Sequence, residues 1–233
     1  MAKRKVKADI RGRAMAWLFL VCALLGCLLG LTLRPGFYAS YWGTNYMWHV
    51  HISDEDADRF FEAIPRALNG DLDALRLNMH DLLAEQEDLA FNEREIAHMA
   101  DVAHLYSLAK IVFVAAALVL TGMALWSWRS MRKDGSLAGI AKGALLGVLD
   151  AVALIGAVAL WAVIDFRSAF WAFHHIAFTN DLWLLDSNDI LIQMMPQSFF
   201  EWAAMMIGLY WLGCVAVWCA CWGVVLKKTR EKA

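Results

Sequence analysis

Several familiar catalytic and cofactor-binding motifs are missing from this chain of 233 residues. It has no HExxH, no paired CxxC, no P-loop, no GxGxxG and no GxSxG, so no motif indicates a zinc peptidase, a nucleotide site or a nucleophile elbow. Its five cysteines all lie within residues 14–33 or 203–226. No disulfide framework is therefore predicted, and we interpret these cysteines as small apolar residues that pack between helices.

Charged residues are almost missing from four long stretches. Hydrophobic residues make up 61% of the chain, above the roughly half that is usual in soluble domains, and twelve tryptophans add to the bias. A helix that crosses a bilayer needs about 20 apolar residues. Runs of that length with at most one charge are Ala14–Leu33, Leu105–Trp128, Gly143–Ile164 and Ala203–Leu226. The first run is longer than the apolar part of a signal peptide, so we interpret it as a membrane span.

Two charges interrupt these runs. Asp150, in the third run, fits either a hydrogen bond between helices or a proton relay. Lys110, in the second run, is expected to extend its long side chain to a membrane interface.

Lysine is missing from residues 35–104, which carry fourteen Asp and Glu and only four Arg. Basic residues gather instead in residues 3–13, 129–142 and 227–232. Because cytoplasmic loops are rich in Lys and Arg, both chain termini are predicted to be cytoplasmic. The formal net charge of −2 hides this split, and the acidic bulk argues against nucleic-acid binding.

These features predict an all-α polytopic membrane protein with four transmembrane helices and a small extracytoplasmic cap. The predicted order is a cytoplasmic N-terminus (1–13), a first span (14–33), the cap (34–104), a second span (105–128), a cytoplasmic loop (129–142), a third span (143–165), an extracytoplasmic interfacial loop (166–202), a fourth span (203–226) and a cytoplasmic tail (227–233).

Local signals predict the structure of the cap. Residues 53–56 have capping-box spacing ahead of a helix that residues 69–70, Asn-Gly, bring to an end. Alternating apolar residues over Leu75–Met79 predict a short strand, and a second helix is predicted from about Asn92 into the second span.

The interfacial loop has its own signals. Aromatic residues over Phe166–Phe178 predict a helix that lies in the headgroup plane. Residues 186–189, Asp-Ser-Asn-Asp, predict a turn, and Pro196 is expected to break the chain before the fourth span.

Two groups of titratable residues are candidates for chemistry. Glu95, His98 and Asp101 recur at three-residue spacing, so they share a helix face on which a carboxylate can orient the histidine. An ordinary solvated helix face fits the same spacing. His174 and His175 are consecutive and point to different faces of a helix, so one of them is expected to serve a given site. An interfacial histidine hydrated by water fits this pair equally well.

A weaker pattern joins His49 and His51, whose rings share one face of a strand, to the acidic run 54–58. This pattern is a weak signal for a metal site, and we predict neither a metal nor a cofactor.

Two stretches resemble a known family. FNEREIAHMADV, residues 91–102, and FHHIAFTNDLWLLDSNDILIQMMPQSFF, residues 173–200, resemble the bacterial lipoprotein intramolecular transacylases, which are four-span membrane proteins of about this length. The matching motifs are E-x-x-H-M-x-D-V, F-H-x-x-x-F-x-N-D-x-W, D-x-L-I and P-x-x-F-F. The sequence departs from the family pattern at Ala103, at Ser187 and at Gln197, which stands where the family pattern P-E-x-F-F has Glu, and none of these positions is a histidine.

The resemblance implies an enzyme of the bacterial plasma membrane whose site faces the extracytoplasmic side. Such an acyltransferase moves the sn-2 acyl chain of a diacylglyceryl-cysteine to the α-amino group of that cysteine and leaves a lyso-form lipoprotein. Two histidines are implied to catalyse the transfer by acid and base chemistry, and the motifs match them to His98 and His174, with His175 as the alternative.

The same resemblance implies supporting or substrate-binding residues around this pair. Glu95 or Asp101 is expected to orient His98, and four residues of the loop are expected to order it or hold the substrate: Asn180, Asp181, Trp183 and Asp189. The implied partners are a diacylglyceryl lipoprotein and membrane lipids, with no nucleic acid and no nucleotide.

Two other functions remain open from the residues alone. The first is another membrane acyltransferase or hydrolase with the same architecture, in which the two histidines are still essential. The second is a non-enzymatic sensor or assembly protein, in which they are not. A transporter fits less well, because Asp150 and Lys110 are the only charges inside the apolar runs and no internal repeat is evident.

Overall fold

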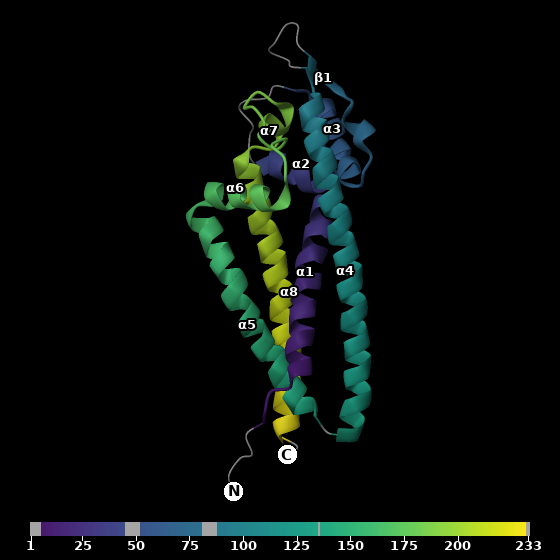
Figure 1. Cartoon of the computed structure of the whole chain (residues 1–233), viewed down its shortest axis with the longest axis vertical. Helices are drawn as coiled ribbons and strands as arrows, with labels where there is room; N and C mark the ends of the chain where they lie inside the picture. The colour runs from purple at the N-terminus through teal and green to yellow at the C-terminus, as the bar shows by residue number, and fades with distance from the viewer. Residues whose placement is uncertain (1–5, 45–51, 81–87, 135, 232–233) are drawn as a thin grey trace. The chain divides into compact units, whose positions relative to one another are not determined.

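The computed structural model describes residues 6–44, 52–80, 88–134 and 136–231. The described chain is mainly helical (Figure 1). Its helices are α1 (Ile10–Thr32), α2 (Pro35–Thr44), α3 (Asp54–Leu68), α4 (Glu93–Asp134), α5 (Leu137–Ile164), α6 (Phe166–Ala177), α7 (Ile190–Met194) and α8 (Gln197–Glu231). A 3-10 turn, η1 (Leu72–Leu75), precedes strand β1 (Asn78–His80), which pairs antiparallel with β2 (Asp88–Ala90).

Four of these helices, α1, α4, α5 and α8, are long and apolar enough to cross a membrane. The predicted all-α, four-span fold is therefore confirmed. Each helix extends beyond the apolar run that predicted it. The extension is largest in α4, where twelve polar and apolar residues precede Leu105 in the same helix.

The chain divides into two compact units. We call Met1–Cys27, Ile111–Ile164 and Gly208–Ala233 the span unit, and Leu28–Lys110 with Asp165–Ile207 the cavity unit.

Small residues bring α1 and α5 close together in the span unit. A Cβ atom on Gly143 would lie 2.1 Å from the carbonyl oxygen of Asp9, and one on Gly147 would lie 2.8 Å from the Cβ of Ala16. Gly139, Gly143 and Gly147 are four residues apart and therefore share one face of α5. Without side chains there, the two backbones touch, as is common between helices in membranes.

Polar contacts also join the helices of the span unit. The Trp211 indole N–H donates to the carbonyl of Leu20 at 3.0 Å. Asp150 forms an ion pair with Arg13, with 3.6 Å between Oδ2 and Nε. Of the two interpretations of Asp150, this contact favours the bond between helices over the proton relay.

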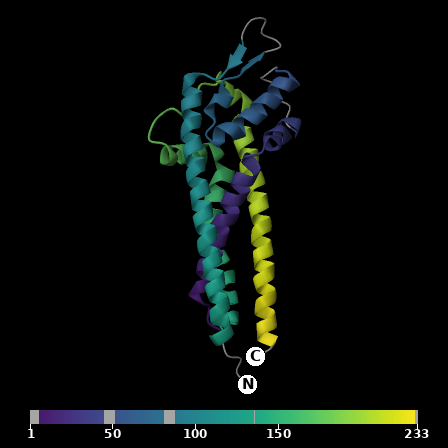
Figure 2. The same ribbon diagram turned by 90° about the vertical axis from the view of Figure 1, so that its right-hand side faces the viewer.

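Caps define α3 in the cavity unit as the sequence predicts. The Ser53 side chain accepts a hydrogen bond from the backbone N–H of Asp56 at 3.1 Å. At the other end Asn69 closes the helix and Gly70 has φ +99°, a conformation that favours glycine. In both views α3 lies beside the first turns of α4 (Figures 1 and 2). Lys110 of α4 donates to the Asn69 side chain at 2.6 Å.

The strand predicted over Leu75–Met79 is only partly correct. Leu75 ends the 3-10 turn η1, and only the last two residues of the range belong to β1. Both Leu75 and Met79 are fully buried, so their alternation reflects burial in a turn as well as in a strand.

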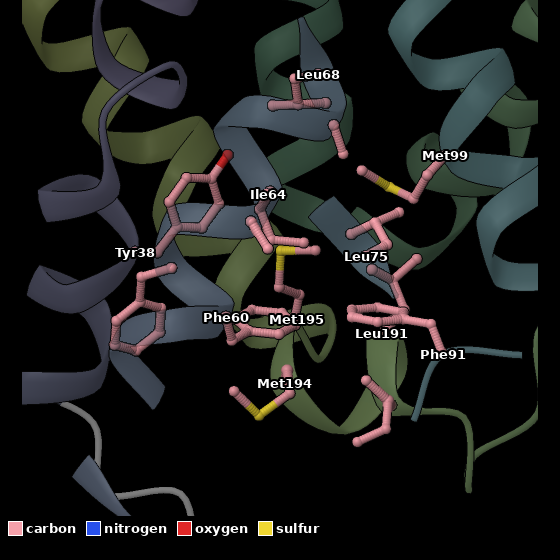
Figure 3. Packing of buried hydrophobic residues seen from close by; sticks show 14 of the residues in the cluster. Tyr38, Phe60, Ile64, Leu68, Leu75, Phe91, Met99, Leu191, Met194 and Met195 are labelled. Atoms are coloured by element: carbon pink, nitrogen blue, oxygen red, sulfur yellow. The ribbon is translucent and has the colours of Figure 1, made fainter. Parts of the chain in front are cut away.

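One hydrophobic core holds the cavity unit together (Figure 3). It combines aromatic rings, methionines and branched side chains from α2, α3, the start of α4, α7 and the start of α8. Phe60 stacks on Phe91 at 5.8 Å, and Phe199 stacks on Tyr38 at 5.6 Å. Pro196 separates α7 from α8, which confirms the predicted break.

Helix α6 runs crosswise to the first turns of α8 (Figure 1). Its N-cap is Asp165, whose side chain accepts from the backbone N–H of Ser168 at 3.0 Å. One side of α6 exposes Phe173 and Ile176, the latter at 86%. This amphipathic helix fits the predicted position in a headgroup layer.

Candidate active site

Two histidines from separate helices meet inside the cavity unit. His98 lies in the second turn of α4, before its apolar run, and His174 lies in the last turn of α6. Their ring centroids are 6.1 Å apart and the ring planes are tilted by 34°. Each residue is only 7% exposed. The structure thus brings together the two histidines that the motifs indicate.

Both rings line an apolar cavity of about 560 Å³. Its wall is formed by α1, α2, α3, α4, α6, the following loop, α7 and α8, all within the cavity unit. Phenylalanines dominate the side near α6 and α8, including Phe170, Phe178 and Phe200. A cavity of this size with an apolar lining has room for a hydrocarbon chain beside the two imidazoles.

The tautomer of His174 is fixed by the backbone. Its Nδ1 lies 2.7 Å from the carbonyl oxygen of Phe170, one turn earlier in α6. Since a carbonyl can only accept, Nδ1 carries the proton in the neutral ring, and Nε2 keeps its lone pair. Trp183 packs against the ring with centroids 4.9 Å apart and limits its rotation.

His98 is held by packing rather than by hydrogen bonds. Its Nδ1 is buried and has no hydrogen-bond partner among the described residues. Phe178 meets the ring edge to face, with centroids 5.3 Å apart. A buried polar atom left unpaired in this way costs free energy, which a ligand with a polar group can recover.

Burial keeps both imidazoles neutral near pH 7. It lowers the pKa of His98 from 6.5 to about 4, with a further lowering from His174 and an opposing effect of the Asp101 charge. Burial also lowers the pKa of His174, against the hydrogen bond to Phe170. A neutral pair can accept one proton and donate another, which is the requirement for acid and base catalysis.

The Glu95 carboxylate accepts hydrogen bonds from two backbone N–H groups, and they fasten the start of α4 to α7. One oxygen accepts from the backbone N–H of Asn92 at 2.7 Å, and the other accepts from that of Leu191 at 2.7 Å. Glu95 is 0% exposed. Its role is therefore to hold the helix that carries His98, and the N-x-x-E spacing of residues 92–95 is a capping signal in the sequence.

Asp101 and Asn180 join α4 to the loop after α6. The Asn180 side chain donates to Asp101 Oδ2 at 2.9 Å, and its own oxygen accepts from the backbone N–H of Leu182 at 3.0 Å. Arg94 donates to the backbone carbonyl of Asp181. No local pattern in the sequence predicts the Arg94 contact.

The remaining predicted residues divide between the loop and the surface. Asp189 accepts from the Asn92 side chain and from the backbone N–H of Asp186, both at 2.7 Å, so it orders the turn. Trp183 is buried against His174. His175 is exposed and contacts indole rings, which leaves it outside the cavity.

Three hydroxyl groups in the cavity wall were not predicted. Tyr106 donates to the Thr32 hydroxyl at 2.9 Å, Thr32 donates to the carbonyl of Leu28 at 2.8 Å, and Tyr38 donates to the carbonyl of Thr32 at 2.8 Å. Two of these bonds reach carbonyls near the end of α1, and a change from apolar to polar residues at a helix terminus can indicate such contacts.

The weak metal pattern of His49 and His51 lies outside the described residues. Within the described ranges, no group of three or more His, Cys, Asp or Glu side chains is placed to hold a metal ion.

Comparison with known proteins agrees with the resemblance inferred from the motifs. The sequence model of the family described as "Lipoprotein intramolecular transacylase Lit" matches residues 14–200. A crystal structure of the membrane integral lipoprotein intramolecular transacylase Lit from Bacillus cereus matches with a TM-score of 0.70 and 19% identity, over 95% of each chain. A variant of that protein with a histidine replaced by alanine matches with a TM-score of 0.63 and 20% identity, over 95% of this chain and 93% of that one. No curated protein sequence gives a significant match.

Proposed function

This chain belongs to the lipoprotein intramolecular transacylase family, and we propose that it moves the sn-2 acyl chain of a diacylglyceryl-cysteine to the α-amino group of the same cysteine. The observation that carries this proposal is the pair of buried, neutral imidazoles 6.1 Å apart in the wall of an apolar cavity. The product is a lyso-form lipoprotein with one acyl chain on nitrogen and one on glycerol.

His174 acts as the base in this proposal. Its Nδ1–H is bound to the Phe170 carbonyl, so the lone pair of Nε2 is available for a proton. That proton comes from the amine, whose unperturbed pKa is about 8. The buried ring and its fixed tautomer support this assignment over the exposed His175.

His98 acts as a hydrogen-bond donor to the oxyanion. With a pKa of about 4 it stays neutral at the working pH and carries one N–H. A neutral imidazole can donate that N–H to the tetrahedral intermediate without releasing its proton.

The atoms and charges of the reaction balance without a cofactor. The amine nitrogen forms a bond to the acyl carbon, and the bond from that carbon to the glycerol oxygen breaks. The ammonium gives up two protons. One is lost to solvent before attack, and the other passes through His174 to the departing glycerol oxygen. Donor and acceptor belong to one molecule, so orientation supplies much of the rate enhancement.

The apolar cavity supports the lipid part of the proposal. Phenylalanine side chains and the aliphatic residues of α4 and α8 can bury the transferred acyl chain, and burial contributes about 0.8 kcal/mol per methylene. The amphipathic α6 places His174 one helix turn from residues suited to the headgroup layer. We further propose that this layer is the extracytoplasmic one, because residues 34–104 and 166–202 lack the basic bias of the other connections.

The test is mass spectrometry of the N-terminal lipopeptide of a reporter lipoprotein. The host makes only diacylglyceryl lipoproteins with free amines and expresses this protein or a variant. We expect an N-acyl, monoacylglyceryl product, which falls by a factor of about 10²–10⁴ in His98→Ala and His174→Ala. His175→Ala should keep most of the product, because that ring lies outside the cavity.

The alternatives give other products. Free fatty acid with an unmodified amine would indicate a hydrolase, and an acylated second molecule would indicate transfer between molecules. An unchanged reporter, with folded protein in the membrane, would contradict the proposal.

A further inference from the structure

Asp101 is placed differently from the other carboxylates near the histidines. Asp101 lies one turn after His98 in α4, on the same face of that helix. One carboxylate oxygen accepts from Asn180 at 2.9 Å, whereas the other has no hydrogen-bond partner among the described residues. The side chain is neither fully buried nor fully exposed, so it can meet a ligand that bridges water and the cavity.

The neighbouring carboxylates are already engaged or lie elsewhere. Both oxygens of Glu95 accept backbone N–H groups, and both oxygens of Asp189 hold the turn after the loop. Asp101 is the carboxylate whose charge acts on His98, where it opposes the lowering of the pKa by burial.

The site also contains an unsatisfied polar atom beside Asp101. Nδ1 of His98 is buried and has no hydrogen-bond partner among the described residues. The residue as a whole is only 7% exposed to solvent. A charged carboxylate oxygen and a buried ring nitrogen on one helix face indicate a ligand group that is polar and cationic.

We propose that Asp101 binds the α-ammonium group of the substrate's N-terminal cysteine and holds it beside the two histidines. This inference rests on the proposed function and adds a substrate-binding residue to it. Asn180 keeps the carboxylate in place by binding Oδ2, and the other oxygen faces the ammonium. The lipid enters the cavity while the amine stays at its polar edge.

The experiment compares two lipopeptides that cannot react. In both, the two acyl chains are joined to glycerol by ethers, so no acyl group can be transferred. One has a free α-amine and the other is N-acetylated. Their dissociation constants are measured on purified protein at pH 7, by competition with a fluorescent diether lipopeptide. We expect the native protein to bind the free amine about tenfold more tightly.

Asp101→Asn should remove this preference, because the amide keeps an acceptor for Asn180 but loses the charge. The N-acetylated lipopeptide should bind the variant and the native protein alike. Asp186→Asn, which neutralises an exposed carboxylate of the loop that carries Asn180, should keep the preference.

Three results would overturn the inference. They are equal binding of the two lipopeptides to native protein, a preference that survives in Asp101→Asn, and a loss of binding to both lipopeptides in that variant. The last would mean that Asp101 has a purely structural role. Binding does not depend on turnover, so a native protein that forms N-acyl product without this preference would refute the inference and leave the proposed function intact.

Discussion

The span unit and the cavity unit are built from some of the same helices but are packed by opposite means. In the span unit, glycines of α5 let two helix backbones touch. In the cavity unit, rings and methionines from short elements separate the helices and enclose a cavity of about 560 Å³. Helices α1, α4 and α8 contribute to both units, so the change depends on side-chain size rather than on the helices themselves.

The difference assigns close helix packing to the span unit and the candidate active site to the cavity unit. Backbone contact leaves no room for a substrate and needs no buried titratable group. The cavity unit accepts two buried imidazoles and two buried carboxylates, those of Asp56 and Glu95, each of which costs free energy unless neighbours satisfy it. Changes in the two units should therefore have separable consequences.

The largest effect is expected from Gly143→Leu in the span unit. The new Cβ would lie 2.1 Å from the Asp9 carbonyl, so α1 and α5 must move apart. The free energy of unfolding should fall by more than about 3 kcal/mol, the upper end for ordinary overpacking. This should appear as a lower midpoint of thermal unfolding or as no folded protein. Gly143→Ala should show the same effect to a smaller extent.

The matched control is Gly156→Leu in the same helix, where a Cβ would meet nothing within 4 Å. Equal midpoints for Gly143→Leu and Gly156→Leu would refute the close packing of α1 and α5.

The next effect is expected from Glu95→Ala in the cavity unit. It leaves the backbone N–H groups of Asn92 and Leu191 unpaired, at a cost of about 2–4 kcal/mol in the free energy of unfolding. Activity should fall in parallel with the folded fraction. Glu93→Ala, at an exposed position two residues earlier, should change neither. An unchanged free energy of unfolding in Glu95→Ala would show that α4 does not need this anchor.

The pH dependence separates the substrate amine from the histidines. A pKa lowered to about 4 extends the neutral form of His98 well below pH 6.5, and His174 shifts in the same direction. From pH 7 to 5.5 the initial rate should therefore fall at least about 30-fold, the factor for protonation of an amine with a pKa near 8, and protonation of His98 should add nothing to this fall. Circular dichroism checks that the protein stays folded. A much steeper fall with an inflection near pH 6.5 would show that the histidines are not buried as described.

The smallest effect is expected from Tyr106→Phe in the cavity wall. It removes one hydrogen bond to Thr32 and should lower the free energy of unfolding by about 1 kcal/mol. The yield of N-acyl product should not change. Tyr210→Phe, at an exposed position, is the control for both measurements. A large loss of product with normal stability would give the hydroxyl cluster a part in the reaction.

Features that depend on near neighbours in the sequence could be predicted. The caps of α3, the break at Pro196 and the four apolar helices follow from local spacing and composition. The glycine spacing of α5 is equally local and indicates a helix face suited to close packing. The strand over Leu75–Met79 was partly wrong, because short apolar alternation does not distinguish a turn from a strand.

Contacts between distant residues could not be predicted in the same way. Glu95 was one of two carboxylates expected to orient His98, with Asp101 as the other, but its partner Leu191 lies 96 residues away. The bond between Asp101 and Asn180 spans 79 residues. The pairing of His98 with His174 was indicated by motif resemblance. Their distances from the second and third apolar runs indicate only that both lie near the same membrane interface.

The tautomer of His174 has a further consequence for how this site can change over generations. Its partner is the carbonyl of Phe170, a group that every amino acid carries. Substitutions at position 170 can alter the ring that lines the cavity but leave the acceptor in place. Drift in the cavity wall can therefore change the shape of the cavity, while the tautomer of His174 is kept by the helix backbone itself.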